Sequence, residues 1–554
     1  MKKIAKKLME KPVLVFCVIV FVQLLIIMFW GNKKSNFYWD EYYTYNNAHY
    51  ISNGSMEMSY VFLSPTLKEG EWMNMSELKE YFIAPLPSES QMYNDSIPRI
   101  MKYVIYRMYY LLLALMETLL FPEMISKWSG ILLNMALFII CQIFLYKLAK
   151  YVSGNTNIAL LSVLFFGCCG EIISMAVFVR FYVMVFTFLL IATYLHALMW
   201  EGQKWYINII YEVISALLVF IAFGNSELAC IYGALLVGCF SLGLMIKKRW
   251  KQFCYYSLPI GGAGALYLLI KTDYIKAFFF PEKVVNSHAA AQDAEYWLVD
   301  AYASISVKEI IRRTGITTSI LGNYLLGHKI IFWVVFAGLI VLIFLCIRKY
   351  IDAKKKMNVN GGSAFVSSDN ENKNLEFYYI MLGTVVGYII FSVLICLWEN
   401  RYYSLMFPEL VILGIGGIYL MTQYLEKEKM GRVILCVLTV MMLILTYSIP
   451  QIDNLYVEDK DITNQVKVLS KEYDAVSCED SFVIQDCVVW SDSDSDYICT
   501  NGRPMTELEL PTEFLYWSSG EVSEDTKEEL YDMGYSNISF VGNTYLSHIY
   551  LVEK

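Results

Sequence analysis

The chain has 554 residues, of which 57% are hydrophobic and 17% are charged, and its formal net charge is −8. This composition excludes an ordinary soluble protein, because the apolar residues gather into separate runs long enough to cross a bilayer as helices. It also excludes a membrane β-barrel, whose strands would show short alternating segments. The acidic balance comes largely from the C-terminal tail and argues against nucleic acid as a partner.

The hydropathy pattern predicts about eleven membrane-spanning helices. The first is too long for a typical cleaved signal and is followed by no small-residue cleavage site, so we expect an uncleaved anchor. The sequence therefore predicts an all-α polytopic membrane protein. The expected spans are residues 13–30, 129–147, 156–174, 180–199, 207–223, 228–246, 253–270, 330–347, 377–397, 402–422 and 433–449.

Basic residues orient these spans. Lysines and arginines cluster before the first span and after the sixth, eighth and tenth spans. Because such residues are enriched in cytoplasmic loops, we expect a cytoplasmic N-terminus in a multi-pass protein of the plasma membrane. Residues 31–128, 271–329 and 450–554 would then lie outside.

The expected domains are a multi-span domain over residues 1–450 and an extracytoplasmic domain over 451–554. Residues 352–374, rich in Lys, Asn, Ser and Gly, are expected to form a flexible cytoplasmic loop. The tail has soluble composition, and its short β-like runs alternate with helical patterns such as Glu524–Met533, which indicates a small α/β domain. The expected strands are Asp474–Ser477, Phe514–Trp517, Asn537–Val541 and Ile549–Val552.

The outer loop 31–128 contains one strongly helical pattern. Residues Ile97 to Leu120 read as an amphipathic helix that would lie along the membrane surface. The alternative is a twelfth span, which would place the tail inside. Arg107 and Glu117 within the pattern favour the surface position.

Two adjacent carboxylates, Asp40 and Glu41, stand about ten residues after the first span among aromatic side chains. Ionised groups near a bilayer are costly unless they are hydrated or paired, so they usually mark function. Neighbouring residues do not share a helix face; one can act as a general base while the other binds substrate or a nearby cation. The alternative is a solvated start of the outer loop. Asp95 is a further acid, either catalytic or a cap of the following helix.

Two arginines are expected at the same outer depth, each with a tyrosine close by. Arg180 precedes Tyr182 at the outer end of the fourth span, and Arg401 precedes Tyr402 at the start of the tenth. The guanidinium group is a forked, permanently charged donor that suits phosphate, although either arginine can instead extend to lipid headgroups. Glu227, another acid at the outer rim, either binds acceptor or pairs with an arginine.

These motifs, in this order, resemble those of the C-type membrane glycosyltransferases, which include the protein O-mannosyltransferases and the lipid A aminoarabinose transferases. Trp39-Asp40-Glu41 resembles the Asp-Glu signature of the first outer loop, and Asn94-Asp95-Ser96-Ile97-Pro98 resembles a degenerate Asp-x-His-Pro-Pro element. Arg180-Phe181-Tyr182 is similar to an Arg-Met-Tyr stretch, and Arg401-Tyr402 with Pro408 is similar to a late Arg-Tyr motif. The histidine and one proline of the loop element are replaced here.

The resemblance implies a polyprenyl phosphate sugar as donor, undecaprenyl in most bacteria, and inverting transfer on the outer face. That chemistry fits these residues: Asp40 is the candidate base for the acceptor proton, with Asp95 or Glu41 orienting the acceptor or sharing this role. Arg180 and Arg401 with Lys102 would stabilise the departing phosphate. Tyr182, Tyr402 and Glu227 would contact substrate, and no metal is obligatory. The expected acceptor is a cell-wall polymer, glycolipid or protein.

Two other functions remain open. A transporter or flippase of lipid-linked sugars would need charges in mid-span and a water-filled path, whereas these acids cluster at the outer rim. A non-catalytic membrane protein of polymer assembly that keeps the fold is the second alternative, since part of the loop element is lost.

Overall fold

The computed structural model describes residues 11–53, 70–86, 97–270, 306–360, 369–395, 397, 399–448, 452–477, 482–500 and 503–554, with the side chains of 97–106, 263–270, 352–360 and 369–373 left aside. The chain divides into two compact units. The first contains residues 1–23, 137–173 and 182–451, and the second contains residues 24–136, 174–181 and 452–554. Each is described by itself.

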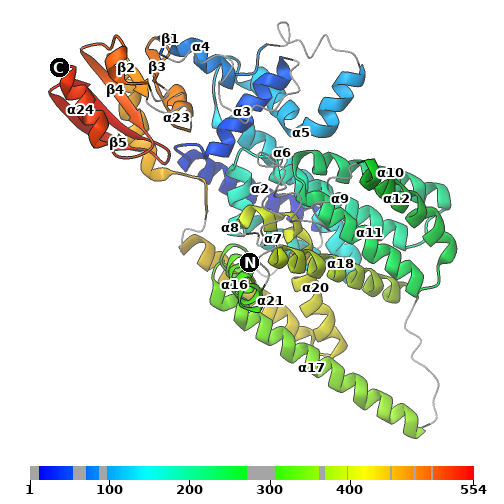
Figure 1. Ribbon diagram of the computed structural model, residues 1–554. Coiled ribbons are helices and arrows are strands. Elements are labelled where there is room, and N and C mark those ends of the chain that lie inside the picture. Colours follow the sequence, from blue (N-terminus) through cyan, green and yellow to red (C-terminus); the bar gives the residue numbers. More distant parts are fainter. Residues whose placement is uncertain are drawn as a thin grey trace. The chain divides into compact units, whose positions relative to one another are not determined.

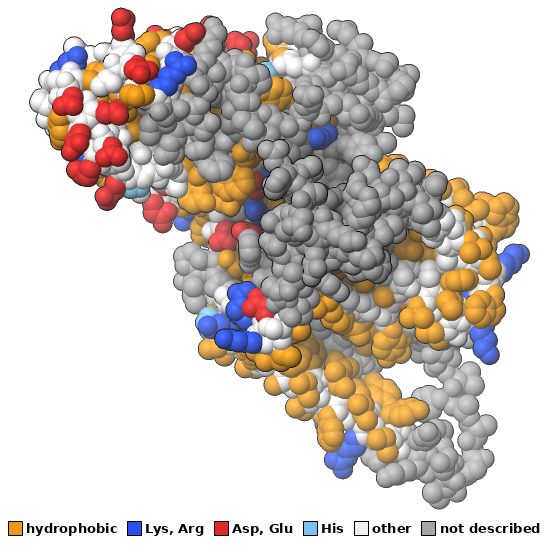
Figure 2. Space-filling model, viewed as in Figure 1, with side chains coloured by type: hydrophobic (Ala, Val, Ile, Leu, Met, Phe, Trp, Pro, Cys, Tyr) orange, Lys and Arg blue, Asp and Glu red, His pale blue; other side chains and the backbone are white. Residues whose placement is uncertain are grey.

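The first unit is helical (Figure 1). Its central helix is α9 (Tyr182–Trp200), which contacts α10, α11, α18 and α20 and buries 83% of its most apolar window, whereas α17 buries 6% of its window. Exposed apolar side chains over the outer helices are visible in Figure 2, and such a surface is stable in lipid rather than in water. The helices are α7 (Thr156–Cys168), α9, α10 (Trp205–Asn225), α11 (Leu228–Ile246), α12 (Trp250–Ile270), α16 (Val307–Ile320), α17 (Lys329–Asn360), α18 (Asp369–Leu394), α19 (Asn400–Tyr403), α20 (Phe407–Tyr424) and α21 (Glu428–Ser448).

Within the described residues, nine helices are long and apolar enough to cross a membrane. The helices α7 and α8 (Gly170–Val177) add a tenth if this pair, bent by 57°, counts as one span. Ten of the eleven predicted spans therefore correspond to these helices. The remaining prediction, residues 253–270, falls on α12; because the side chains of residues 263–270 lie outside the description, this span stays a prediction. The chain is a multi-pass membrane protein with an all-α membrane part, as predicted.

The predicted cytoplasmic loop overlaps two helices. Helix α17 continues to Asn360 and α18 begins at Asp369, while residues 361–368 lie outside the described part of the chain.

The second unit combines helices from the first outer loop with the C-terminal residues. Helices α2 (Pro12–Lys33), α6 (Lys127–Ser153) and α8 have residues in both units. The remaining elements are α3 (Trp39–Ser52), β1 (Met73–Asn74), α4 (Met75–Lys79), α5 (Ile97–Leu120), α22 (Lys460–Leu469), β2 (Asp474–Ser477), α23 (Phe482–Trp490), β3 (Asp496–Cys499), β4 (Glu513–Ser518), α24 (Glu524–Asp532), β5 (Asn537–Asn543) and β6 (His548–Glu553).

A six-stranded sheet forms the C-terminal part, in the order β1-β3-β2-β4-β6-β5. Strand β2 is parallel to β3 and β4, while the other pairs are antiparallel. Its core includes Val476, Phe514, Tyr516 and Leu530. The predicted α/β domain is confirmed, and all four predicted strands are present. Strand β1, however, comes from the outer loop, so residues 31–128 contribute to the same sheet.

Helix α5 occupies the predicted residues and bends at Arg107, whose φ of −142° is not helical. It packs against α3. The side chains of α5 are described only from Arg107 to Leu120, so its position along the membrane surface stays a prediction. The last part of α5 buries a carboxyl group, because Glu117 is 1% exposed. Burial raises the pKa of Glu117 well above its ordinary value, and the backbone N–H of Ala84 opposes this rise.

We expect Glu117→Gln to flatten the dependence of stability on pH. Above the ordinary pKa of a glutamate and below the raised pKa of Glu117, the folded protein binds more protons than the unfolded chain, so stability falls as pH rises. Glutamine keeps the shape and does not titrate, so the melting temperature of the variant relative to the wild type should increase from pH 5 to pH 8 in detergent. The exposed Glu528→Gln is the control, and equal pH profiles for both variants would contradict the assignment.

Candidate active site

The acidic pair lies at the start of α3, where the chain changes from an extended linker to a helix. Tyr38 is the N-cap residue and is extended, with φ −71° and ψ 149°. Glu41 reaches back to accept a hydrogen bond from the N–H of Tyr38 at 2.7 Å. This is the geometry of a capping box, which fixes the direction in which a helix begins.

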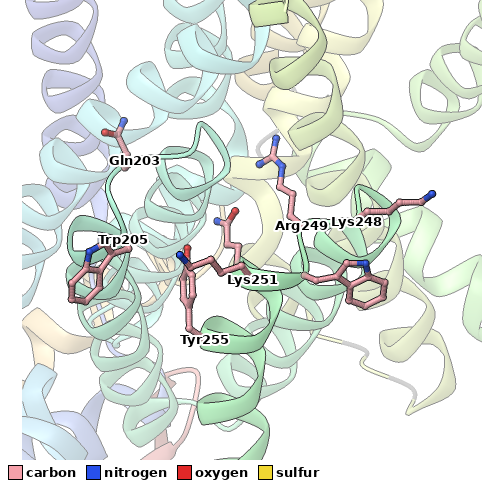
Figure 3. Close-up of a pocket in the computed structure, with 8 residues that line it drawn as sticks. Gln203, Trp205, Lys248, Arg249, Lys251 and Tyr255 are labelled. Atoms are coloured by element: carbon pink, nitrogen blue, oxygen red, sulfur yellow. The ribbon is translucent and has the colours of Figure 1, made fainter.

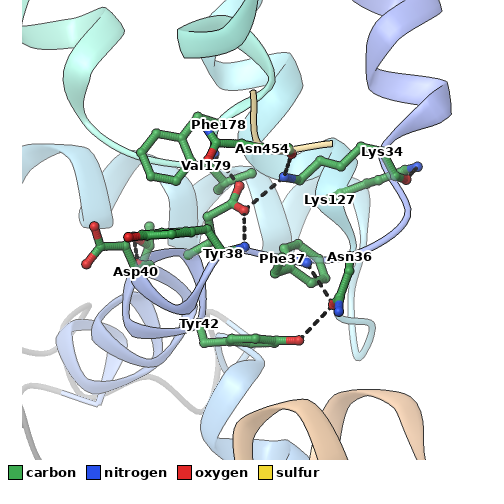
Figure 4. Close-up of polar contacts among 12 residues, drawn as sticks. Lys34, Asn36, Phe37, Tyr38, Asp40, Tyr42, Lys127, Phe178, Val179 and Asn454 are labelled. Carbon is green, nitrogen blue, oxygen red and sulfur yellow. Dashed lines mark hydrogen bonds and ion pairs between the residues drawn. The ribbon is translucent and has the colours of Figure 1, made fainter. Parts of the chain in front are cut away.

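Glu41 also anchors two other segments (Figure 4). Its Oε2 forms an ion pair with Lys34 Nζ at 2.8 Å, and its Oε1 accepts from the N–H of Val179 at 2.7 Å. Both charged side chains of the pair are 0% exposed. Glu41 therefore holds the linker after α2, the start of α3 and residues 178–180 together, and it is closed off from solvent.

The charges of this pair depend on each other. Burial raises the pKa of Glu41, and Lys34 with the N–H groups of Val179 and Tyr38 acts against that rise. Burial likewise lowers the pKa of Lys34, and Glu41 acts against that change. Lys34 also donates to the carbonyl of Asn454 at 2.5 Å.

Asp40 points away from this anchor and toward Arg180. One guanidinium nitrogen of Arg180 lies 3.6 Å from Asp40 Oδ1, and another donates to the Asp40 carbonyl at 3.1 Å and to Thr44 Oγ1 at 3.2 Å. The side chains of Asp40 and Arg180 are 9% and 13% exposed. The structure thus brings together two of the predicted site residues, a carboxylate and a guanidinium, within the second unit.

Residues 178–180, which carry Arg180, are positioned by helix α6. Asn134 donates from its side chain to the carbonyl of Phe178 at 2.7 Å. Gly130, one turn earlier on α6, lies so close to Val179 that any β-carbon on it would overlap the valine side chain. A glycine is therefore required where α6 passes this segment.

The linker before α3 is bonded to the C-terminal residues through Asn36. The side-chain oxygen of Asn36 accepts from Trp490 Nε1 at 2.8 Å and from Tyr42 OH at 3.0 Å, and its amide nitrogen donates to Asp459 at 2.8 Å and to Asp486 at 3.3 Å. Burial raises the pKa of Asp486, and the hydrogen bonds from its neighbours, Thr544 first, act against this. The network ties α3 to the C-terminal residues.

Arg401 belongs to the first unit and is 8% exposed. Its Nε lies 3.7 Å from Glu399 Oε2, and its guanidinium lies 5.3 Å from the centre of the Tyr402 ring. The preceding residue, Asn400, donates to Glu171 Oε2 at 2.9 Å, and Glu171 is fully buried. The Arg401-Tyr402 motif, with the preceding Asn400, therefore combines a guanidinium with the buried carboxylate of Glu171.

The other predicted site residues lie apart from these contacts or outside the description. Tyr182 is the first residue of α9 and is buried, and Glu227 is the exposed N-cap residue of α11. Lys102 is on α5, where its side chain is not described, and Asp95 lies outside the described residues.

Several residues of these contacts were not predicted. No local motif marks Lys34, Asn36 or Asp486. Their partners either are distant in the sequence or come close only through the turn into α3. Glu171 did offer a signal, since a carboxylate within an expected membrane span usually has a role. Asn400 stands directly before the predicted Arg401.

No protein-family model matches the sequence, and no curated protein sequence matches it either. Among solved structures, ArnT from Cupriavidus metallidurans bound to undecaprenyl phosphate aligns with a TM-score of 0.52 and 12% identity, covering 99% of this chain and 98% of that chain. The apo state of the same protein aligns with a TM-score of 0.49 and 10% identity over the same shares. The fold is therefore that of the C-type membrane glycosyltransferases. At this level of identity the likeness concerns the fold, and within that class it is ArnT-like.

Lys34→Met should destabilise the protein strongly, because it leaves the Glu41 carboxylate buried without its cation. Removal of one partner of a buried ion pair costs about 3–5 kcal/mol. The double variant Lys34→Met/Glu41→Gln should melt at a higher temperature than Lys34→Met alone. Lys349→Met is the matched control, since its pair with Glu426 is exposed and is worth about 1 kcal/mol at most. Equal losses in the two single variants would show that the Lys34–Glu41 pair is not an anchor.

Gly130→Ala should displace residues 178–180 and so weaken the bonds to Glu41 and Asp40. We expect a loss of about 1–3 kcal/mol from overpacking, measured as a lower melting temperature in detergent. Gly238→Ala, with no atom within 4 Å of an added β-carbon, should leave the melting temperature unchanged. An unchanged melting temperature in Gly130→Ala would mean that α6 tolerates the added methyl group.

Proposed function

We propose that the protein is a membrane glycosyltransferase that moves a sugar from a polyprenyl phosphate donor to an extracytoplasmic acceptor with inversion. The observation that carries the proposal is the Asp40–Arg180 pair, with Asp40 Oδ1 3.6 Å from a guanidinium nitrogen of Arg180, held at the start of α3. The ArnT-like fold supports the enzyme class, and the ArnT structure bound to undecaprenyl phosphate supports a polyprenyl phosphate as lipid partner.

In the proposed reaction, the oxygen of an acceptor hydroxyl forms a bond to the anomeric carbon of the sugar as the bond from that carbon to the donor phosphate breaks. The hydroxyl proton passes to Asp40, which acts as general base. The polyprenyl phosphate leaves with the bonding electrons. Attack opposite the leaving group inverts the anomeric carbon. Atoms and charge balance without any further reactant.

Charge develops on the departing phosphate, and the arginines are the groups suited to stabilise it. Arg180 would bind the phosphate while it keeps its backbone and Thr44 contacts, and this would loosen its contact with the Asp40 carboxylate. Donor binding would thus release the base when it is needed. Arg401 and Lys102 are the further proposed phosphate ligands, and Tyr182, Tyr402 and Glu227 are proposed to contact substrate. A lipid monophosphate does not require a metal.

Glu41 takes a different role in this proposal. Its two oxygens are engaged by Lys34, Tyr38 and Val179, which makes it a positioning residue. Consecutive side chains of a helix point about 100° apart. Fixing Glu41 therefore also fixes the direction of Asp40, which points to a different side of α3. Asp95 is the proposed residue for orienting the acceptor.

The location follows from the charge pattern. We place the protein in the plasma membrane with a cytoplasmic N-terminus, so that α3 and the C-terminal domain are outside. The apolar tail of the donor would then remain among the membrane helices while its phosphate reaches the outer rim.

Asp40→Asn should reduce sugar transfer at least about 100-fold, since a positioned general base contributes that much or more. The measurement is transfer from a panel of radiolabelled polyprenyl phosphate sugars to native membrane extract by purified protein. Asp532→Asn, an exposed aspartate of the outer domain, is the matched control and should keep full activity.

Transfer that survives in Asp40→Asn would remove Asp40 as the base. Transbilayer movement of the lipid-linked sugar in proteoliposomes, without transfer to any acceptor, would replace the enzyme assignment by a flippase.

A further inference from the structure

A shallow pocket of about 400 Å3 lies in the first unit where α10 and α12 begin (Figure 3). Among the described residues, those that line it include three cations and no carboxylate. The lining includes Gln203, Trp205, Lys248, Arg249, Trp250 and Lys251. The pocket lies at the opposite end of α9 from Tyr182, about 28 Å along a helix of this length. It is thus remote from Tyr182, one of the residues proposed to contact substrate.

The backbone around the pocket favours an anion. Helices α10 and α12 both begin at its edge, with Trp205 and Trp250 as their first residues. The first N–H groups of a helix lack intrahelical partners and carry a partial positive charge. The opposing carbonyls at the end of α9 are occupied, because Arg249 donates to the Trp200 carbonyl at 2.8 Å and Gln252 to the Met199 carbonyl at 3.1 Å.

The turn that carries the lysines is well defined. The N–H of Lys248 donates to Met245 at 2.9 Å and the N–H of Arg249 to Leu244 at 2.9 Å, which closes the end of α11. Lys248 is held in the left-handed region with φ 57°, which is uncommon for a residue other than glycine. Arg249 is stacked 4.6 Å from the Trp200 ring. The fixed Arg249 thus lines the pocket together with the exposed Lys248 and Lys251.

The ends of the neighbouring span candidates predict that the pocket lies at the depth of lipid headgroups. Helices α9, α10 and α11 are membrane-span candidates, and the pocket lies where α9 and α11 end and α10 begins. Trp205 and Trp250 are 65% and 53% exposed, as expected of indoles at a membrane–water interface. Beyond them, exposed Ile209 and Leu258 continue the apolar surface along α10 and α12, where acyl chains can lie.

We propose that this pocket binds the phosphodiester headgroup of an anionic phospholipid on the side predicted to be cytoplasmic. The two lysines and the helix N-termini contact the phosphate, while Trp205, Trp250 and Tyr255 surround the glycerol region. The site is separate from the proposed donor site and holds a lipid that is not consumed.

The test uses the full-length protein in phosphatidylcholine nanodiscs that contain graded amounts of phosphatidylglycerol. Native mass spectrometry measures the phosphatidylglycerol retained, and the melting temperature is recorded alongside. Lys248→Gln/Lys251→Gln should retain phosphatidylglycerol about 25-fold more weakly, since each lysine near an anionic lipid contributes roughly fivefold. Lys427→Gln/Lys429→Gln removes two exposed lysines from another loop on the same predicted side and should bind as the wild type does.

Equal retention by both double variants, whether weakened or not, would overturn the site, because the effect would then be a general one of surface charge. A third arm adds inorganic phosphate to nanodiscs of phosphatidylcholine alone. A melting-temperature rise in this arm that is lost in Lys248→Gln/Lys251→Gln would assign the pocket to a soluble phosphate and overturn the lipid assignment.

Discussion

The arrangement at the start of α3 depends on one buried ion pair. Lys34 and Glu41 are both removed from water, and two isolated charges would be costly there. The cost is offset because the hydrogen-bonding capacity of Glu41 is used by Lys34 and by the N–H groups of Tyr38 and Val179. Pairing alone is weak evidence for stability, but this pair joins residues 34–41 to Val179 and, through Lys34, to Asn454, which are far apart in the sequence.

Two adjacent acids can therefore serve different purposes. Glu41 is enclosed and fully bonded, so its charge acts on the structure. Asp40 lies one residue earlier, on another side of the helix, with its carboxylate next to Arg180. If Glu41 were released, α3 could rotate, and the distance between Asp40 and Arg180 would no longer be fixed. Precise placement of a reacting group is worth several orders of magnitude in rate, so in the proposed reaction Glu41 matters to the action of Asp40, which is itself only 6% exposed.

Much of the fold could be predicted from the sequence, because the signals were local. Ten of the eleven spans expected from hydropathy correspond to helices that are long and apolar enough to cross a membrane. Strand β2 coincides with the predicted Asp474–Ser477. Strands β1 and β3 were missed, since β1 has only two residues and β3 follows a Ser- and Asp-rich run. The partners of Glu41 were also beyond prediction. Val179 is 138 residues away and donates through its backbone, which no side-chain pattern reveals.

The C-terminal residues contribute to the linker that precedes α3 as well as to their own sheet. Lys34 donates to Asn454, the N–H of Ser35 donates to Leu455 at 2.8 Å, and Asn36 binds both Asp459 and Asp486. A buried polar network of this kind stabilises one geometry only when every member is satisfied. Strand β1 adds a further connection, because the outer loop completes the edge of the sheet. The C-terminal domain thus fixes the geometry of the linker, and through it the direction in which α3 presents Asp40.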